Sequence, residues 1–130
     1  MRKAFLACIC AVAAMCLSCS EKKAEYTAGQ AAKEYYDMLF AGDYAGFTDA
    51  MFFPDSIPES YRSQLVANAA MFAARQKELH NGVREVQILG CKTDTASSTA
   101  QAFLLFCYGD SLSEEVVVPM TRHNGKWLMR

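Results

Sequence analysis

The sequence predicts an α+β fold in which three N-terminal helices pack on a curved antiparallel sheet of four strands. Apolar residues recur at helical spacing as far as about residue 80, and beyond Gly82 they alternate with polar ones. An Asn124-Gly125 pair joins the last two alternating segments, which is a strong hairpin signal. The helices therefore come first and the strands follow.

The first nineteen residues have the pattern of an export signal that ends in a lipid anchor. A basic start at residues 1–3 precedes the apolar run Ala4–Leu17, which is shorter than the roughly twenty residues needed to cross a bilayer. Ser18 and Cys19 then resemble the lipobox of bacterial lipoproteins, in which the cysteine is acylated; Cys16 stands where leucine is usual. The alternatives are a plain signal peptide with an incidental cysteine and an uncleaved membrane helix.

These features divide the chain into three parts. Residues 1–18 are expected to be a signal peptide, residues 19–26 the lipidated Cys19 with a polar tether, and residues 27–130 a single domain. The expected location is the bacterial cell envelope, on a membrane, facing the periplasm or the cell surface. The net charge is −1 and the basic residues are scattered, which disfavours a nucleic-acid partner.

Two cysteines, Cys91 and Cys107, fall within the predicted domain. On consecutive strands of a hairpin that turns at residues 94–97, Cys91 would face Ser98 or Thr99 and lie too far from Cys107 for a disulfide. We expect two buried, reduced thiols. The sequence has neither a C-x-x-C motif nor histidines at ligand spacing, so it predicts no metal and no cofactor.

Capping signals place the helices. Thr27 and Gln30 form a capping box ahead of a helix that runs to about Phe40, and Asp43 caps a second, shorter helix through Met51.

The third helix is predicted to be the long one. Ser56 and Glu59 have the spacing of a second capping box, and the helix should end at residues 80–82, with Gly82 at the C′ position.

Four strands are predicted after Gly82. The first runs to Cys91, and the second, Thr99–Tyr108, is apolar on both faces, as a central strand covered on both sides would be. The third and fourth cover Glu114–Arg122 and Lys126–Met129, and Pro119 within the third strand should mark a bulge or an unpaired face.

This order of elements, with an Asn-Gly-Lys-Trp hairpin near its end, resembles the nuclear-transport-factor-two-like superfamily, also called the cystatin-like α+β fold. The match spans about residues 27–130. Residues 42–44, 80–83, 118–120 and 124–127 are similar to an uncharacterised bacterial lipoprotein branch of that superfamily. The resemblance implies a curved sheet that wraps the long helix and leaves a cone-shaped hollow, which relatives use as an active site or as a binding site. Fold alone does not fix function.

An apolar hollow is what this sequence would give. The candidate pocket residues are Tyr35, Leu39, Tyr61, Leu65, Phe72, Phe103, Leu105, Val118, Met120 and Trp127. The alternative interpretation is that these side chains simply fill the core.

Catalytic candidates are few. Isomerase-like and dehydratase-like relatives place an acid, a histidine or a tyrosine in the cone. Here His80 fits a helix C-terminus and His123 lies beside a turn, and Asp49 is the one acid that no cap or turn explains. The leading hypothesis is therefore a non-catalytic, lipid-anchored protein whose cone binds a small hydrophobic ligand or a partner protein. A small isomerase or dehydratase is the alternative, and a homodimer through the sheet face is a further expectation.

Overall fold

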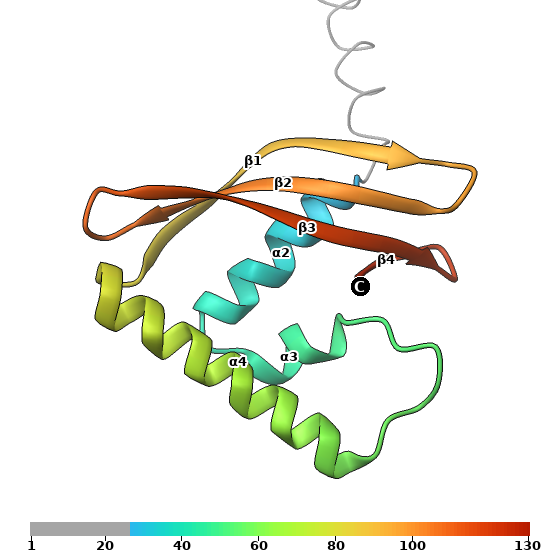
Figure 1. The fold of residues 1–130 in the computed structure, drawn as a ribbon, viewed down its shortest axis with the longest axis horizontal. Coiled ribbons are helices and arrows are strands. Elements are labelled where there is room, and N and C mark those ends of the chain that lie inside the picture. The colour runs from blue at the N-terminus through green and yellow to red at the C-terminus, as the bar shows by residue number, and fades with distance from the viewer. Residues whose placement is uncertain (1–26) are drawn as a thin grey trace, which may run out of the picture.

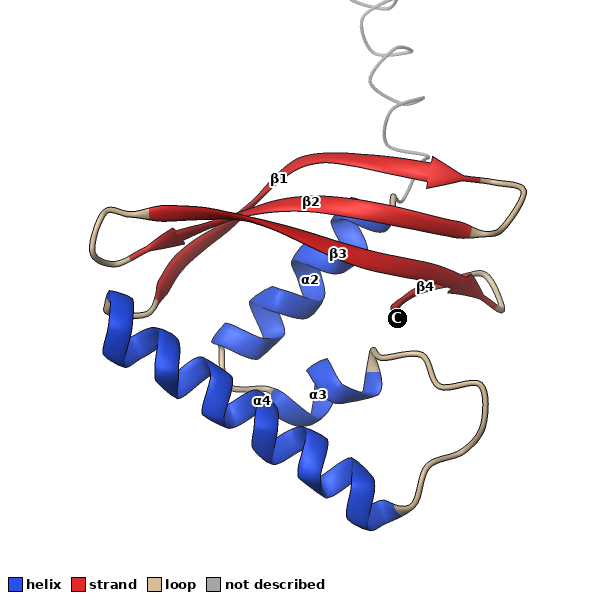
Figure 2. Ribbon diagram, viewed as in Figure 1, coloured by secondary structure: helices blue, strands red, loops and turns tan. Residues whose placement is uncertain are grey.

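The computed structural model describes residues 27–130, so the predicted signal peptide, Cys19 and the tether lie outside the described residues. Three helices are followed by four strands (Figure 1): α2 (Ala28–Phe40), α3 (Tyr44–Asp49), α4 (Glu59–His80), β1 (Val83–Asp94), β2 (Thr99–Tyr108), β3 (Ser113–His123) and β4 (Lys126–Met129). The strands form one antiparallel sheet in the order β1-β2-β3-β4, and the helices lie on one side of it (Figure 2). The predicted fold class is confirmed.

The first two helices begin as predicted. Thr27 Oγ1 accepts a hydrogen bond from the Gln30 amide, and the Gln30 side chain accepts one from the Thr27 amide, which completes the capping box. Gly42 makes the corner after α2 with a φ of 97°, a conformation that favours glycine. Asp43 then caps α3 by accepting from the Gly46 amide.

The helix covered by the sheet is α2, which corrects the expectation that the sheet wraps the long helix. Figure 1 shows α2 lying against the sheet, with α3 and α4 farther from it. Ala31 and Ala32 on α2 are fully buried, whereas Ala69 is the one buried residue of α4. Small side chains on α2 let the strands approach closely: a Cβ at Gly29 would lie 3.2 Å from Ile88 Cγ2.

The start of α4 also differs from the prediction. Pro58 occupies the N-cap position with extended backbone and no side-chain cap, so Ser56 does not form the predicted capping box with Glu59. The reason is that a residue before proline is disfavoured in the helical region, which keeps Ile57 out of the first turn. At the other end Asn81 is left-handed and the Gly82 amide bonds back to the Gln76 carbonyl, so the predicted stop is confirmed.

The sheet keeps the predicted alternation along β2. Its helix-facing residues, Ala100, Ala102, Leu104, Phe106 and Tyr108, are all buried. The helices lie on one side of the sheet and Phe103 and Leu105 on the other face are half-buried, so the expectation of a strand covered on both sides is wrong. Pro119 pairs with Gln101 in an unbroken register, so no bulge forms there. Its carbonyl accepts a hydrogen bond from the Arg130 amide at the end of β4, so the structure has neither the bulge nor the unpaired face that the sequence predicted at Pro119.

The two cysteines lie far apart along the β1–β2 hairpin. Strand β1 extends to Asp94, so Cys91 pairs with Ala102 rather than with Ser98 or Thr99, while Cys107 pairs with Glu85. Both thiols are free, as predicted. Cys107 is buried but Cys91 is exposed, so the expectation that both are buried is wrong for Cys91. Cys91 lies on β1, which is an edge strand of the sheet.

Within residues 27–130, no helix combines the length and apolar character needed to cross a membrane.

Candidate functional site

The structure divides the ten predicted pocket residues among three places. Five lie in the buried core between α2 and the sheet: Tyr35, Leu39, Val118, Met120 and Trp127. Three lie on α4: Tyr61, Leu65 and Phe72. The last two, Phe103 and Leu105, lie on the sheet face turned away from α2, because their neighbours in β2 point inward.

The space predicted to be a cone-shaped hollow is filled by side chains. Met120 is fully buried and Trp127 is 7% exposed, and the Tyr35 hydroxyl donates to the Trp127 carbonyl at 2.5 Å. Burial raises the pKa of Tyr35. Between α2 and the sheet, therefore, the simple core interpretation is the correct one.

An apolar groove of about 240 Å³ lies instead among the helices. Its walls come from α2, α3 and α4 and from Met51: Tyr36, Leu39, Phe47, Met51, Leu65, Asn68, Ala69 and Phe72. The groove brings together three of the predicted residues, Leu39, Leu65 and Phe72. The sequence missed its location because nothing in the periodicity says which helix faces the sheet.

Aromatic rings in edge-on and tilted contacts form one side of the groove. The Tyr36 ring meets Phe47 edge-on at 5.1 Å and lies 5.2 Å from Phe106, and Phe40 contacts both Phe106 and Phe72. Such pairs add to the energy of area burial and fix ring positions. Burial raises the pKa of Tyr36. The groove is thus a preformed, carbon-rich surface whose polar groups are the Tyr36 hydroxyl and the Asn68 amide.

The apolar side of α4 continues past the groove at both ends. Tyr61, Leu65, Phe72 and Leu79 follow the helical repeat along one side, as the sequence predicted, but three of them are exposed: Tyr61 by 47%, Phe72 by 41% and Leu79 by 59%. We call these four residues the α4 stripe. An apolar stripe that is open to solvent along a long helix is a surface that a bound ligand or partner protein can cover.

A second apolar surface lies on the outer face of the sheet. Phe103 and Leu105 are half-buried there, and Val117, which pairs with Phe103, is 52% exposed. Leu89, next to the β1 bulge, is 48% exposed. This patch is the sheet face that the sequence offered as a dimer interface.

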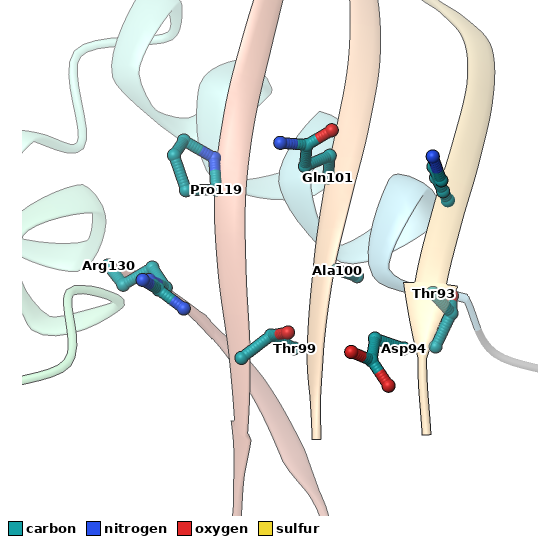
Figure 3. Close-up of a pocket in the computed structure, with 8 residues that line it drawn as sticks. Thr93, Asp94, Thr99, Ala100, Gln101, Pro119 and Arg130 are labelled. Atoms are coloured by element: carbon teal, nitrogen blue, oxygen red, sulfur yellow. The ribbon is translucent and has the colours of Figure 1, made fainter. Parts of the chain in front are cut away.

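A polar hollow of about 440 Å³ lies at one end of the sheet (Figure 3). Gln101 and Pro119 lie side by side there on neighbouring strands, with Arg130 beyond them and Thr93 and Asp94 at the end of β1. Its lining mixes charged and hydroxyl side chains with Ala100 and Pro119 and includes no aromatic side chain, which is typical of solvated surface rather than of a ligand pocket.

The acid that the sequence could not explain has a structural partner. Asp49 accepts two hydrogen bonds from the Arg62 guanidinium, each 2.9 Å, and these lower the pKa of Asp49. The pair ties α3 to the start of α4, and it lies outside the apolar groove.

His80 is held at the far end of α4. Its Nδ1 lies 2.9 Å from Asp110, its ring stacks on Tyr108 at 4.0 Å, and the Tyr108 hydroxyl donates to Glu114. The hydrogen bond to His80 lowers the pKa of Asp110, and burial together with Glu114 raises that of Tyr108 to about 12. This network fastens α4 to the β2–β3 turn.

Metal ligands do not gather in the described domain: no three His, Cys, Asp or Glu side chains of residues 27–130 lie close enough to hold an ion.

The comparisons place the fold. No family model matches the sequence, and no curated protein matches it. A crystal structure from Campylobacter jejuni, described as a candidate NTF2-like transpeptidase, superimposes with a TM-score of 0.62 over 75% of this chain and 92% of that one, at 19% identity. At that identity the likeness shows the fold alone. The chain thus has an NTF2-like fold, as its resemblance implied; the lipoprotein branch stays a prediction.

Proposed function

We propose that this is a lipid-anchored protein of the bacterial cell envelope that binds an apolar group, a small hydrophobic molecule or a segment of a partner protein, in the groove beside α4. The observation that carries the proposal is the position of Leu65 and Phe72. Both line the groove, and both belong to the α4 stripe that is left open to solvent.

Burial energetics support this role. Moving apolar surface out of water is worth about 25 cal/mol per Å², so a groove lined by carbon gains free energy from any apolar occupant of matching shape. Contacts among the rings of Tyr36, Phe40 and Phe47 hold one wall of the groove in place, so binding costs little side-chain conformational entropy there. Since the stripe extends from Tyr61 to Leu79, an extended partner would cover more of it than a compact molecule would.

The anchor is supported by the sequence. A basic start, an apolar run too short to span a bilayer and a small residue before Cys19 are features of a lipoprotein signal, although Cys16 replaces the usual leucine. Acyl chains on Cys19 would hold the domain at a membrane, because two or more chains anchor stably. Changing Cys19→Ala should release the protein into the soluble fraction or leave it unprocessed. A Cys19→Ala protein that is still processed to the mature size and still retained at the membrane would contradict lipidation at this residue.

The isomerase-type or dehydratase-type alternative lacks a base in the groove. Its lining residues include neither a carboxylate nor an imidazole, and their one ionisable side chain is Tyr36, whose pKa is raised by burial. Asp49 is bonded to Arg62 and His80 to Asp110, both outside the groove. Proton abstraction at the reacting carbon requires such a group within hydrogen-bond reach. Binding is therefore the function that the site supports better.

The groove can be tested with the apolar dye N-phenyl-1-naphthylamine, whose fluorescence rises in apolar surroundings. The wild-type protein should enhance it, and Leu65→Glu should abolish the enhancement, because a carboxylate in a carbon-lined groove cannot be desolvated cheaply. Met71→Glu is the matched control, since Met71 lies on the same helix, is 68% exposed and does not line the groove. Equal enhancement by the two variants would count against the groove as the binding site.

The outer sheet patch supports a separate proposal, a homodimer. Val117→Lys would place a charge at the centre of the patch beside Phe103 and should yield a monomer in sedimentation analysis. A wild-type protein that is already a monomer at every concentration would refute the dimer.

A further inference from the structure

The third strand of the sheet has a free edge. Strand β4 pairs only with residues 120–123 of β3, and the Pro119 carbonyl accepts the last hydrogen bond on that side, from the Arg130 amide. Figure 1 shows β3 continuing well past the short β4. In the part of the chain that the structure describes, no strand pairs with residues 113–118 on the side away from β2. We call this stretch the β3 edge.

Two residues of the β3 edge direct their backbone groups toward the open side. The N–H and C=O groups of a strand alternate between its two sides, so those of Glu115 and Val117 point the same way as those of Pro119. The Pro119 carbonyl points toward β4, since it accepts from Arg130. Both Glu115 and Val117 are exposed, Val117 by 52%. The edge therefore offers amide donors and carbonyl acceptors at the spacing that another strand requires.

The opposite edge of the sheet is less suited to pairing. Strand β1 shifts its register with β2 at two places, between Val83 and Glu85 and between Ile88 and Gly90. Irregularities of this kind twist an edge strand and interrupt its hydrogen-bonding pattern. The pairing of β3 with β2 is unbroken along the whole β3 edge. The β3 edge is therefore the regular template for an added strand.

The apolar groove adjoins both ends of the β3 edge. At one end, Met51 lines the groove and forms a parallel bridge with Met129 of β4. At the other end, Tyr36 lines the groove, and its ring lies 5.2 Å from Phe106 of β2, which is in register with the β3 edge. The Val116 side chain between these ends packs against the core, on the helix side of the sheet. Side chains of an added strand that lie opposite Val116 would face the same side, where the groove is.

We propose that the groove takes an extended segment of a partner protein, which adds a strand to the β3 edge. The segment lies in line with β4, antiparallel to β3, and its backbone exchanges hydrogen bonds with Glu115 and Val117 while alternate apolar side chains enter the groove. The outward position opposite Glu115 suits a lysine or an arginine, because opposite charges on paired strands attract. This inference rests on the proposed function of the groove and selects a peptide segment over a small molecule.

The peptide acetyl-Val-Thr-Val-Lys-Val-Thr-amide is a suitable probe, because its valines share one face and its lysine can lie opposite Glu115. Titrated into the full-length protein in phospholipid nanodiscs, it should shift the NMR signals of the Glu115 and Val117 amides and slow their hydrogen exchange. The same peptide with N-methyl groups on its first threonine and its lysine keeps every side chain but loses the two N–H groups that face β3, and it should not bind. Equal binding of the two peptides, or no change at either amide, would overturn the proposal.

A substitution in the protein tests the same hydrogen bonds from the other side. Val117→Pro removes one donor of the β3 edge and keeps the β2–β3 ladder, because the Val117 amide points away from β2. It should weaken the peptide roughly two- to tenfold, the value of one hydrogen bond, whereas the matched control Val117→Thr retains the amide and should bind as the wild type does. The N-methylated peptide requires no change in the protein, so a Val117→Pro variant that fails to fold leaves that comparison intact.

The dye experiment separates this inference from the proposed function. Val117 does not line the groove, so both variants should enhance N-phenyl-1-naphthylamine fluorescence as the wild type does. Dye enhancement together with equal binding of the two peptides would refute strand addition and leave the groove as a binding site. A wild-type protein that enhances neither the dye nor binds the peptide would refute both.

Discussion

The central structural finding, that α2 and not α4 is the helix buried by the sheet, can be tested with one substitution placed on each helix. Leu39 on α2 is 1% exposed, whereas Leu79 on α4 is 59% exposed. Leu39→Ala removes buried methyl groups and leaves a cavity, a change that costs about 2–5 kcal/mol of unfolding free energy. Leu79→Ala removes carbon that already faces water, and surface changes of that kind stay within about 0.5 kcal/mol.

Urea unfolding followed by fluorescence measures both variants. Trp127 is the single tryptophan of the chain and is buried, so its emission reports loss of the core. Leu39→Ala should lower the urea midpoint without changing the slope, and Leu79→Ala should leave the midpoint in place. A loss below about 1 kcal/mol for Leu39→Ala, or an equal loss for Leu79→Ala, would refute the assignment of α2 as the core helix.

Three further predictions concern polar groups. Tyr35→Phe removes the hydrogen bond to the Trp127 carbonyl and should cost about 1–2 kcal/mol in the same urea experiment; no loss would show that water replaces the bond. His80 lowers the pKa of Asp110, so the stability that Asp110 contributes should be complete above about pH 4 and be lost as the pH falls through the lowered pKa. Asp110→Asn should flatten this part of the plot of melting temperature against pH. An unchanged plot would contradict the pairing. Thr48→Val replaces an orphan hydroxyl by a methyl group and should leave the unfolding free energy unchanged or raise it, whereas a loss above about 1 kcal/mol would reveal a hydrogen bond in the folded protein.

Local signals in the sequence predicted local structure well. The Thr27 capping box, the Asp43 cap, the stop at Gly82 and the Asn124-Gly125 turn all act within a few residues, and the structure has each of them. The capping box expected at Ser56 failed because a nearer effect, the proline at position 58, overrides it.

Long-range packing was harder to predict. Helical spacing correctly grouped Tyr61, Leu65 and Phe72 on one side of α4, but spacing cannot say what that side faces. The sheet instead covers α2, whose alanines allow close approach, and the larger α4 side chains are left half open. Because the sheet covers α2 and not α4, the pocket lies among the helices and not against the sheet, where it was predicted.

Native mass spectrometry of the protein purified from its own host tests the central functional claim most directly. The wild type should carry an additional mass, either a small molecule or a partner chain, and Leu65→Glu should lose it while the Met71→Glu control keeps it. A wild-type protein that carries no additional mass, or a mass that Leu65→Glu retains, would contradict binding in the groove beside α4.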